Sequence, residues 1–216
     1  YYHAVESPYT KVLWKMERCG ITVDGGYLKT RQVPMKKEMT DIEAAFANEA
    51  TRLSGSPRMI NLNSPKDVGY FFYGLLGKPV EKLTDGGASG VKNPSTDATV
   101  LDGWAGQGDP WAQKMGRHRV ISKAYNTYVV GLQQWIDYQS KIHTTLNQTG
   151  AVTGRLSSTD PNLMNIPRPG EDEYKLREGF IPSDGYVLLV ADYEQVEMRL
   201  MADASGDEKM INAINS

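Results

Sequence analysis

Acidic side chains follow directly on a short apolar run near residue 190. Val187–Ala191 is a run of five apolar residues, and Asp192 and Glu194 come next. A run of this length is typical of a buried strand, so the sequence predicts a strand over residues 186–191. A strand buried in a sheet would hold the Asp192 carboxylate rigidly, as a reactive centre requires. An isolated acid that merely caps a strand or starts a helix would give the same pattern.

A polar stretch lies upstream of this run. Residues 147–167 read NQTGAVTGRLSSTDPNLMNIP and offer few side chains to bury, so we expect them on the surface. Their amides and hydroxyls can hydrogen-bond to groove edges and to sugar–phosphate. A polar loop without a special role is the alternative. The glycine spacing and the missing Lys-Ser/Thr ending exclude a phosphate-binding P-loop.

Basic residues outnumber acidic ones between Trp111 and Arg168. The acids in this range are Asp137 and Asp160 alone. The bases are Lys114, Arg117, Arg119, Lys123, Lys141, Arg155 and Arg168. A local basic stretch in a chain of net charge −2 is either a surface that binds a polyanion or a solvent-exposed helix face.

Composition places the chain among ordinary globular proteins. Its 216 residues are 40% hydrophobic and 23% charged, and no apolar run approaches the length of a membrane helix. One cysteine excludes an internal disulfide framework and suits a reducing compartment, so we expect a cytoplasmic protein. The three histidines and the cysteine are scattered, without zinc-type spacing.

Helices are the main elements expected to position these residues. A helix should precede Gly20, followed by a short strand at 21–23 and a turn at 24–26. A long amphipathic helix is predicted by apolar residues at three- and four-residue steps. These residues are Met35, Met39, Ile42, Phe46, Ala50 and Leu53.

Residues that favour helix starts and helix ends mark the shorter helices. Ser64 and Pro65 should start a helix that Gly77 ends, and a Ser-Thr-Asp sequence at 95–97 should start another. Residues 84–94 predict a loop, 110–135 a basic helix, and Val196 to the end further helices. Long helices with loops between them suggest an arm or clamp.

Several motifs in series carry a resemblance to a known family. TGRLSSTDPNLMNIP and VLLVADYEQVEMRLMADASGDE closely resemble segments of the A-family DNA polymerases, the DNA polymerase I type. NLNSPKDVG, NPSTDATVL, HRVISKAYNTYV and KIHTTLNQT resemble further family segments in the same order. The resemblance therefore covers nearly the whole chain. It implies an α+β fold and a DNA-directed DNA polymerase that adds deoxynucleotides to a primer 3′ end.

The resemblance assigns chemistry to the region after the apolar run. Asp192 would be the first of two catalytic aspartates that hold two Mg²⁺ ions, and Tyr193 would add its backbone carbonyl as a ligand. Tyr193, Gln195 and Glu197 would contact the incoming deoxynucleoside triphosphate. Glu197 would pack beneath its sugar and exclude a 2′-hydroxyl.

The resemblance also assigns residues to the primer–template DNA. Arg155 would contact the primer terminus through the minor groove, where acceptors are nearly independent of sequence. Gln148, Asn162 and Asn165 would follow the groove. Arg119 and Lys123, one helical turn apart, would meet the phosphate backbone.

Two residues depart from the family pattern. Glu194 replaces the family's serine, which puts another acid near the metals and leaves its role open. Leu146 replaces a phenylalanine, which is a tolerable apolar exchange.

The family's subdomains would divide the chain in a stated way. Residues 1–26 would be a palm-associated segment, 27–137 a helical thumb, 138–200 a palm segment with antiparallel strands, and 201–216 the start of the fingers. The second catalytic aspartate and the basic triphosphate partners are expected beyond residue 216, in a longer chain or a second chain. The 216 residues alone should then be inactive. Two alternatives stay open: a non-catalytic nucleic-acid-binding remnant, and one subunit of a split polymerase.

Overall fold

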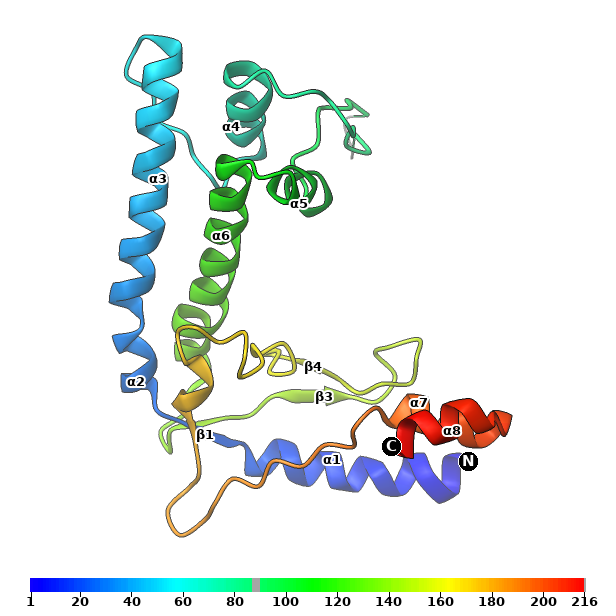
Figure 1. Ribbon diagram of the computed structural model, residues 1–216. Coiled ribbons are helices and arrows are strands. Elements are labelled where there is room, and N and C mark those ends of the chain that lie inside the picture. The colour runs from blue at the N-terminus through cyan, green and yellow to red at the C-terminus, as the bar shows by residue number, and fades with distance from the viewer. Residues whose placement is uncertain (87–89, 216) are drawn as a thin grey trace. The chain divides into compact units, whose positions relative to one another are not determined.

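The computed structural model describes residues 1–86 and 90–215 (Figure 1). Contacts divide the chain into two compact units, Tyr1–Ile181 and Pro182–Ser216. The first unit holds a helical arm and two small sheets, and the second holds an extended segment and two helices.

The first unit begins with a long helix. A π-helical turn, η1 (Tyr2–Glu6), leads into α1 (Ser7–Cys19), which ends where Gly20 takes a φ of +62°. Strand β1 (Ile21–Val23) follows, as expected. The predicted turn at 24–26 is wrong, because Asp24 caps a further helix, α2 (Gly25–Thr30), through a 2.7 Å bond from the Tyr27 N–H to Asp24 Oδ1.

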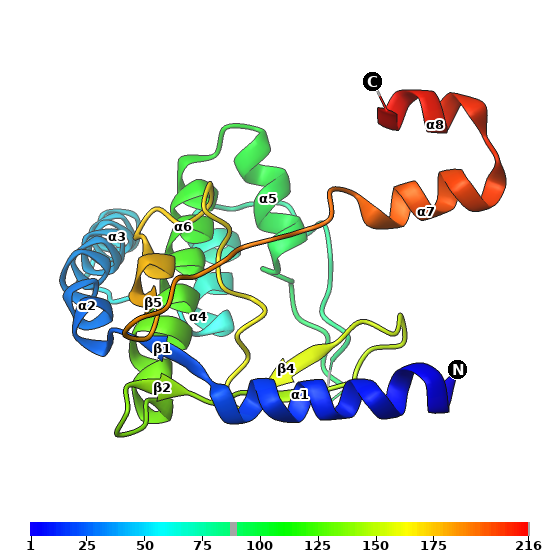
Figure 2. The same ribbon diagram turned by 90° about the horizontal axis from the view of Figure 1, so that it is seen from below.

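A helical arm, residues 32–124, forms most of the first unit. It comprises α3 (Gln32–Ser54), α4 (Pro65–Gly69) with the π-helical turn η2 (Tyr70–Leu75), α5 (Ala98–Gly106) and α6 (Pro110–Ala124). Helices α3 and α6 lie side by side in both views (Figures 1 and 2). The long amphipathic helix is confirmed, because Met35, Ile42, Phe46 and Ala50 on α3 are all buried. The basic helix predicted at 110–135 is confirmed as α6 continued by η4 (Tyr125–Val130) and η5 (Gly131–Trp135).

The helix starts follow the capping residues. Ser64 Oγ accepts the Asp67 N–H at 3.3 Å at the start of α4, and Asp97 Oδ1 accepts the Val100 N–H at 3.1 Å at the start of α5. Both starts were predicted. Asp109 caps α6 in the same way, accepting the N–H groups of Trp111 and Ala112. Gly77, with a φ of +64°, follows the end of η2 as expected.

An aromatic core fills the far end of the arm. Phe46 lies 4.6 Å from Phe71 between ring centroids, and Phe72 lies 5.3 Å from Trp104. All four rings are buried. Each large apolar side chain contributes about 1.5–3 kcal/mol by leaving water, so this cluster rather than helix propensity holds the arm together.

Two small antiparallel sheets lie at the base of the arm. In the first, β1 lies between β2 (Lys141–Ile142) and β5 (Phe180–Ile181), with Ile21 opposite Ile142 and Val23 opposite Phe180. In the second, β3 (Thr145–Asn147) pairs with β4 (Ser157–Thr159). Between β4 and β5 lies a short 3-10 helix, η6 (Leu176–Gly179). Helices and antiparallel strands together confirm the α+β class.

The strand predicted at 186–191 is wrong for this structure. These residues form no ladder, and the side chains of Val187, Leu189 and Val190 are 86%, 89% and 86% exposed. A strand needs hydrogen bonds from a neighbouring strand, and a run that is apolar on both faces needs cover on both. The described residues of the second unit include no other strand that could supply either.

The helices of the second unit agree with the prediction from Val196 onward. They are α7 (Val196–Ser205) and α8 (Glu208–Asn215). Gly206 ends α7 with a φ of +66°, and Asp207 starts α8 by accepting the N–H groups of Lys209 and Met210 at 2.9 and 3.1 Å. The SGDE sequence is thus a helix stop followed by a helix start.

The predicted loop at 84–94 is closed at its base. The Thr84 N–H donates to the Asn93 carbonyl and the Ser95 N–H to the Lys82 carbonyl, both at 2.8 Å. Residues 87–89 of this loop lie outside the described residues. Across the described chain, no helix has both the length and the apolar character needed to cross a membrane.

Candidate nucleic-acid interface and catalytic segment

The polar stretch forms a hairpin and the segment after it. Strands β3 and β4 flank a loop, residues 148–156, that contains Gln148 and Arg155. Arg155 is exposed, whereas Gln148 is half-buried and its amide is engaged. Its Nε2 donates to Glu6 Oε2 at 2.7 Å, and its Oε1 accepts from Thr10 Oγ1 at 2.8 Å. Gln148 therefore ties the hairpin to the N-terminal helix in this structure.

A buried hydroxyl organises the turn after β4. The Leu163 N–H donates to Ser158 Oγ at 3.0 Å, Ser158 Oγ donates to the Pro161 carbonyl at 3.2 Å, and Thr144 Oγ1 lies 2.6 Å away. Ser158 is 2% exposed. Nothing in the sequence marks Ser158 for this role, because it is one of many hydroxyls in the run.

Asn162 and Asn165 follow this turn with exposed side chains. Asn162 Oδ1 accepts the Met164 N–H at 3.0 Å, which fixes the orientation of its amide. The Asn165 backbone carbonyl accepts the Tyr128 hydroxyl, so the segment is attached to the end of the long helical run that begins with α6. Arg155, Asn162 and Asn165 thus lie on one hairpin and its continuation.

Helix α1 contacts the hairpin through Glu17. Glu17 Oε1 accepts the Leu146 N–H of β3 at 2.7 Å, and His143 Nδ1 lies 2.6 Å from the Glu17 carbonyl. Glu17 satisfies a backbone donor that would otherwise lie at a strand edge. Nothing in the sequence pattern marks Glu17 for this role, because its partner is 129 residues away.

Arg119 and Lys123 lie on α6 one turn apart, in different surroundings. Lys123 is exposed. Arg119 lies in a groove of about 460 Å³ between α5 and α6, lined also by Asp102 and Val120. Burial of the guanidinium lowers the pKa of Arg119, although it stays a cation at neutral pH.

Arg117 on α6 is engaged with two acids. Its Nε lies 2.6 Å from Glu38 Oε1 on α3, its Nη2 3.1 Å from Glu38 Oε2, and its Nη1 2.6 Å from Glu173 Oε2. The hydroxyl of Tyr174 donates to Glu38 as well. We call Glu38, Arg117, Glu173 and Tyr174 the Arg117 cluster.

Contacts within the Arg117 cluster change the pKa values of its members. The hydrogen bond from Arg117 holds the pKa of Glu38 below its usual value, and the carboxylates raise the pKa of Arg117. Burial, followed by the bond to Glu38, raises the pKa of Tyr174 to about 12. The cluster thus favours a charged Arg117–Glu38 pair and a neutral tyrosine.

The catalytic segment predicted from the sequence lies in the second unit. Asp192, Tyr193 and Gln195 are exposed, and Gln195 adopts a left-handed conformation with a φ of +48° immediately before α7. Glu197 lies in the first turn of α7, as expected, where a negative charge favours the helix start. Glu194 is 83% exposed at its side chain and lies 3.9 Å from Arg199 Nη2.

The donor set of this segment fits part of a divalent-metal site. Asp192 offers a carboxylate and Tyr193 a carbonyl, both hard oxygen ligands of the kind that Mg²⁺ prefers. Among the described residues, however, no three His, Cys, Asp or Glu side chains gather where they could hold an ion.

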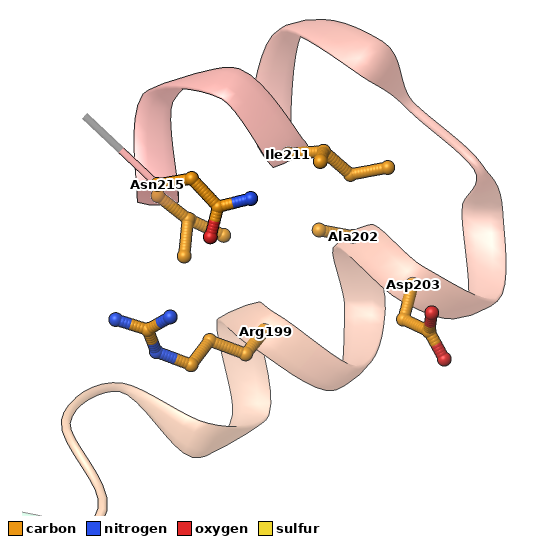
Figure 3. A pocket seen from close by; sticks show the side chains of 6 residues that line it. Arg199, Ala202, Asp203, Ile211 and Asn215 are labelled. Atoms are coloured by element: carbon orange, nitrogen blue, oxygen red, sulfur yellow. The ribbon is translucent and has the colours of Figure 1, made fainter.

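The second unit also contains a shallow hollow between its helices. Arg199, Ala202 and Asp203 from α7 line it together with Ile211 and Asn215 from α8 (Figure 3). Its volume is about 180 Å³. None of the residues predicted to contact nucleotide or DNA lines it, so it is not the candidate site.

A family model matches most of the chain. The model for DNA polymerase family A covers residues 27–216. The chain belongs to DNA polymerase family A. This confirms the resemblance that the motifs carried, and it accounts for the order in which they occur.

Relatives and a solved structure agree with the family. The chain is 38% identical over 219 residues to DNA polymerase I of Mycobacterium bovis, covering 98% of this chain and 22% of the relative. It is 36% identical over 211 residues to the thermostable DNA polymerase I of Thermus thermophilus, covering 97% and 24%. It therefore spans about a quarter of the length of these curated relatives.

One structural neighbour is the POL domain of Pol1 from M. smegmatis, solved in complex with DNA primer-template and dNTP. It matches with a TM-score of 0.81 and 36% identity, over 98% of this chain and 35% of the neighbour. The similarity supports the α+β polymerase-domain fold of the family.

Proposed function

We propose that the protein is a DNA-directed DNA polymerase that adds deoxynucleotides to the 3′ end of a primer in DNA replication or repair. Its 0.81 TM-score to a family A polymerase domain solved with primer-template and dNTP is the observation that carries this proposal. Family membership over residues 27–216 supports it. We also propose that it acts in the cytoplasm of a bacterial cell or of a phage-infected host.

The first unit would hold the primer–template duplex. Four cations of the basic stretch are exposed, namely Lys114, Lys123, Arg155 and Arg168. They lie in the same unit as the exposed amides of Asn162 and Asn165. Cations of this kind meet phosphates without regard to sequence, whereas amides read groove edges. A copying enzyme needs such sequence-independent contact.

The second unit would carry the chemistry. We propose Asp192 and the Tyr193 carbonyl as ligands of Mg²⁺, with the remaining ligands supplied outside the described residues. When bound, the metal pair would supply charge neutralisation at the triphosphate and activation of the primer hydroxyl. Tyr193, Gln195 and Glu197 would contact the deoxynucleoside triphosphate. The proposed subdomains, palm at 1–26 and 138–200, thumb at 27–137 and fingers from 201, follow the same family assignment.

Duplex binding and primer extension test this function. Both are measured on the intact polymerase, by which we mean this chain together with the residues expected beyond position 216. If about four phosphates are neutralised, log K should fall with log salt at a slope of about −3 to −4. Lys123→Gln should reduce the magnitude of that slope by about one, and Lys29→Gln on α2, outside the basic stretch, is the matched control. Binding without extension in the presence of Mg²⁺ would favour a non-catalytic module instead. A flat salt response would contradict the duplex-binding surface.

A further inference from the structure

The Arg117 cluster connects three separate parts of the first unit. Arg117 comes from α6 and Glu38 from α3, the two helices that run along the arm. Glu173 and Tyr174 come from the loop that follows Asn165 and leads to β5. Arg117 binds both carboxylates at 2.6 Å, through different nitrogens. The cluster therefore joins the arm to the chain segment that continues from the groove-reading asparagines.

The loop that carries Glu173 and Tyr174 is itself well held. Asp172 is buried, and its carboxylate accepts the N–H groups of Leu176 and Arg177 at 2.9 and 2.7 Å. On the other side, the Tyr27 hydroxyl of α2 lies 2.8 Å from Glu178 Oε2 and 3.1 Å from the Lys175 carbonyl. Because this loop is rigid, it would move together with the arm and would not deform.

A second tether fixes the same segment farther along the helical run. The Tyr128 hydroxyl donates to the Asn165 carbonyl. Lys123 lies on the helical run between the residues that make the two tethers, Arg117 and Tyr128. The two tethers together fix the position of Lys123, the cation of α6 that we propose to contact phosphate, relative to Asn165.

We propose that Arg117 is a positioning residue, which sets the arm against the groove-reading segment and does not contact phosphate itself. This inference rests on the proposed function. Arg117 lies in the basic stretch, but a phosphate contact would require it to leave two carboxylates that already occupy its planar fork. Bidentate carboxylate pairing of this kind has a fixed geometry, as expected of an orienting contact.

Removal of the Glu38 carboxylate changes DNA affinity in opposite directions under the two roles. Glu38→Gln takes away a negative charge and releases the fork of Arg117. If Arg117 were a phosphate contact, this variant would bind DNA more tightly. If Arg117 positions the arm, the variant binds more weakly although its net charge is more positive.

The experiment measures duplex affinity of the intact protein over a salt series. We expect Arg117→Gln and Glu38→Gln each to weaken binding about three- to tenfold with the salt slope unchanged, and the double variant to be no weaker than Arg117→Gln alone. Lys123→Gln is the matched control, whose slope should change by about one. Arg117→Lys should also weaken binding, because an ammonium keeps the charge and loses the fork.

Several outcomes would overturn the inference. Tighter binding by Glu38→Gln, or a slope reduced by about one in Arg117→Gln, would make Arg117 a phosphate contact. Unchanged affinity in both variants would leave the cluster without a role in binding. If Arg117→Gln does not fold, Arg117→Lys and Glu38→Gln decide alone, by the same criteria. Failure of the unsubstituted protein to bind duplex would contradict the proposed function together with this inference, whereas unchanged variants of a binding protein contradict the inference alone.

Discussion

The hairpin that carries Arg155 and the segment that carries Asp192 differ in what positions them. The hairpin is held by a strand partner, a buried hydroxyl at Ser158 and the carboxylate of Glu17. The apolar run that precedes Asp192 is exposed to solvent on both of its faces. The surface that we propose for duplex binding is thus firmly held, whereas the carboxylate that we propose as reactive lies on a segment without a strand partner among the described residues. Binding and chemistry should therefore respond to substitution separately, and four predictions test that separation.

The largest effect is expected at Asp192. In the intact polymerase, Asp192→Asn should lower primer extension by at least about 10³-fold, because loss of a metal ligand costs several kcal/mol and about 1.4 kcal/mol is tenfold in rate. Duplex affinity should change less than about twofold, since we propose that the first unit holds the duplex. Single-turnover extension and a binding titration measure the two quantities. Asp203→Asn, an exposed aspartate of α7, is the matched control. Near-normal turnover in Asp192→Asn would mean that the motif has been misassigned.

The sugar preference should change at Glu197. Shortening this side chain to alanine should open space for a 2′-hydroxyl and raise ribonucleotide incorporation relative to deoxynucleotide by about tenfold or more, because an added hydroxyl is excluded by a clash and not by lost contacts. The measurement is the ratio of kcat/KM for a matched ribo- and deoxynucleotide in the intact polymerase.

Glu194→Ala is the control for this ratio. It removes a nearby charge that pairs loosely with Arg199 and leaves the expected sugar pocket closed. A ratio that shifts in Glu194→Ala and not in Glu197→Ala would assign the steric role to another residue.

In the first unit, the expected effect is on stability. Ser158→Ala leaves the partly buried Leu163 N–H without its acceptor, which should cost about 1–3 kcal/mol of unfolding free energy. Duplex affinity should fall as well, because Asn162 lies in that turn. Urea unfolding followed by circular dichroism measures the first quantity. Thr153→Ala, exposed in the same hairpin loop, should be nearly neutral, and an equal loss in both variants would remove the special role of Ser158.

The sequence predicts the parts of this fold that depend on neighbouring residues. Ser64, Asp97 and the SGDE sequence act within a few positions of the helix ends they set, and the three- and four-residue apolar period of α3 needs no distant partner. The helices of the arm follow from such local rules, whereas the polar stretch was expected only to lie on the surface and its pairing into a hairpin was not predicted.

Several features that the sequence does not predict depend on distant partners. The Val187–Ala191 run has the composition of a buried strand, but a strand forms only beside another one. Arg117 looks like any helix cation until Glu38, 79 residues away, is brought to it. Glu17 likewise has no local signature. The family resemblance named the candidate site residues, whereas the contacts that hold the arm and the hairpin were found only in the three-dimensional structure.

The smallest effect is expected at Tyr174, in alkaline solution only. Its pKa rises from 10.0 in the unfolded chain to about 12 in the folded protein, so the folded state holds the proton more tightly. The stability linked to this proton is fully present below pH 10 and is lost as the pH rises from about 10 to about 12. Tyr174→Phe removes the titrating group, and its unfolding free energy should therefore decline less over that window than that of the unsubstituted protein.

Unfolding titrations at fixed denaturant between pH 9 and pH 12 would measure this difference as a change of slope. Tyr138→Phe is the matched control, because Tyr138 is 93% exposed and lies outside the Arg117 cluster. An unchanged alkaline limb in Tyr174→Phe would mean that its hydroxyl titrates as it does in water. The bond to Glu38 would then be too weak to hold the loop, and the Arg117 cluster would reduce to its ion pairs.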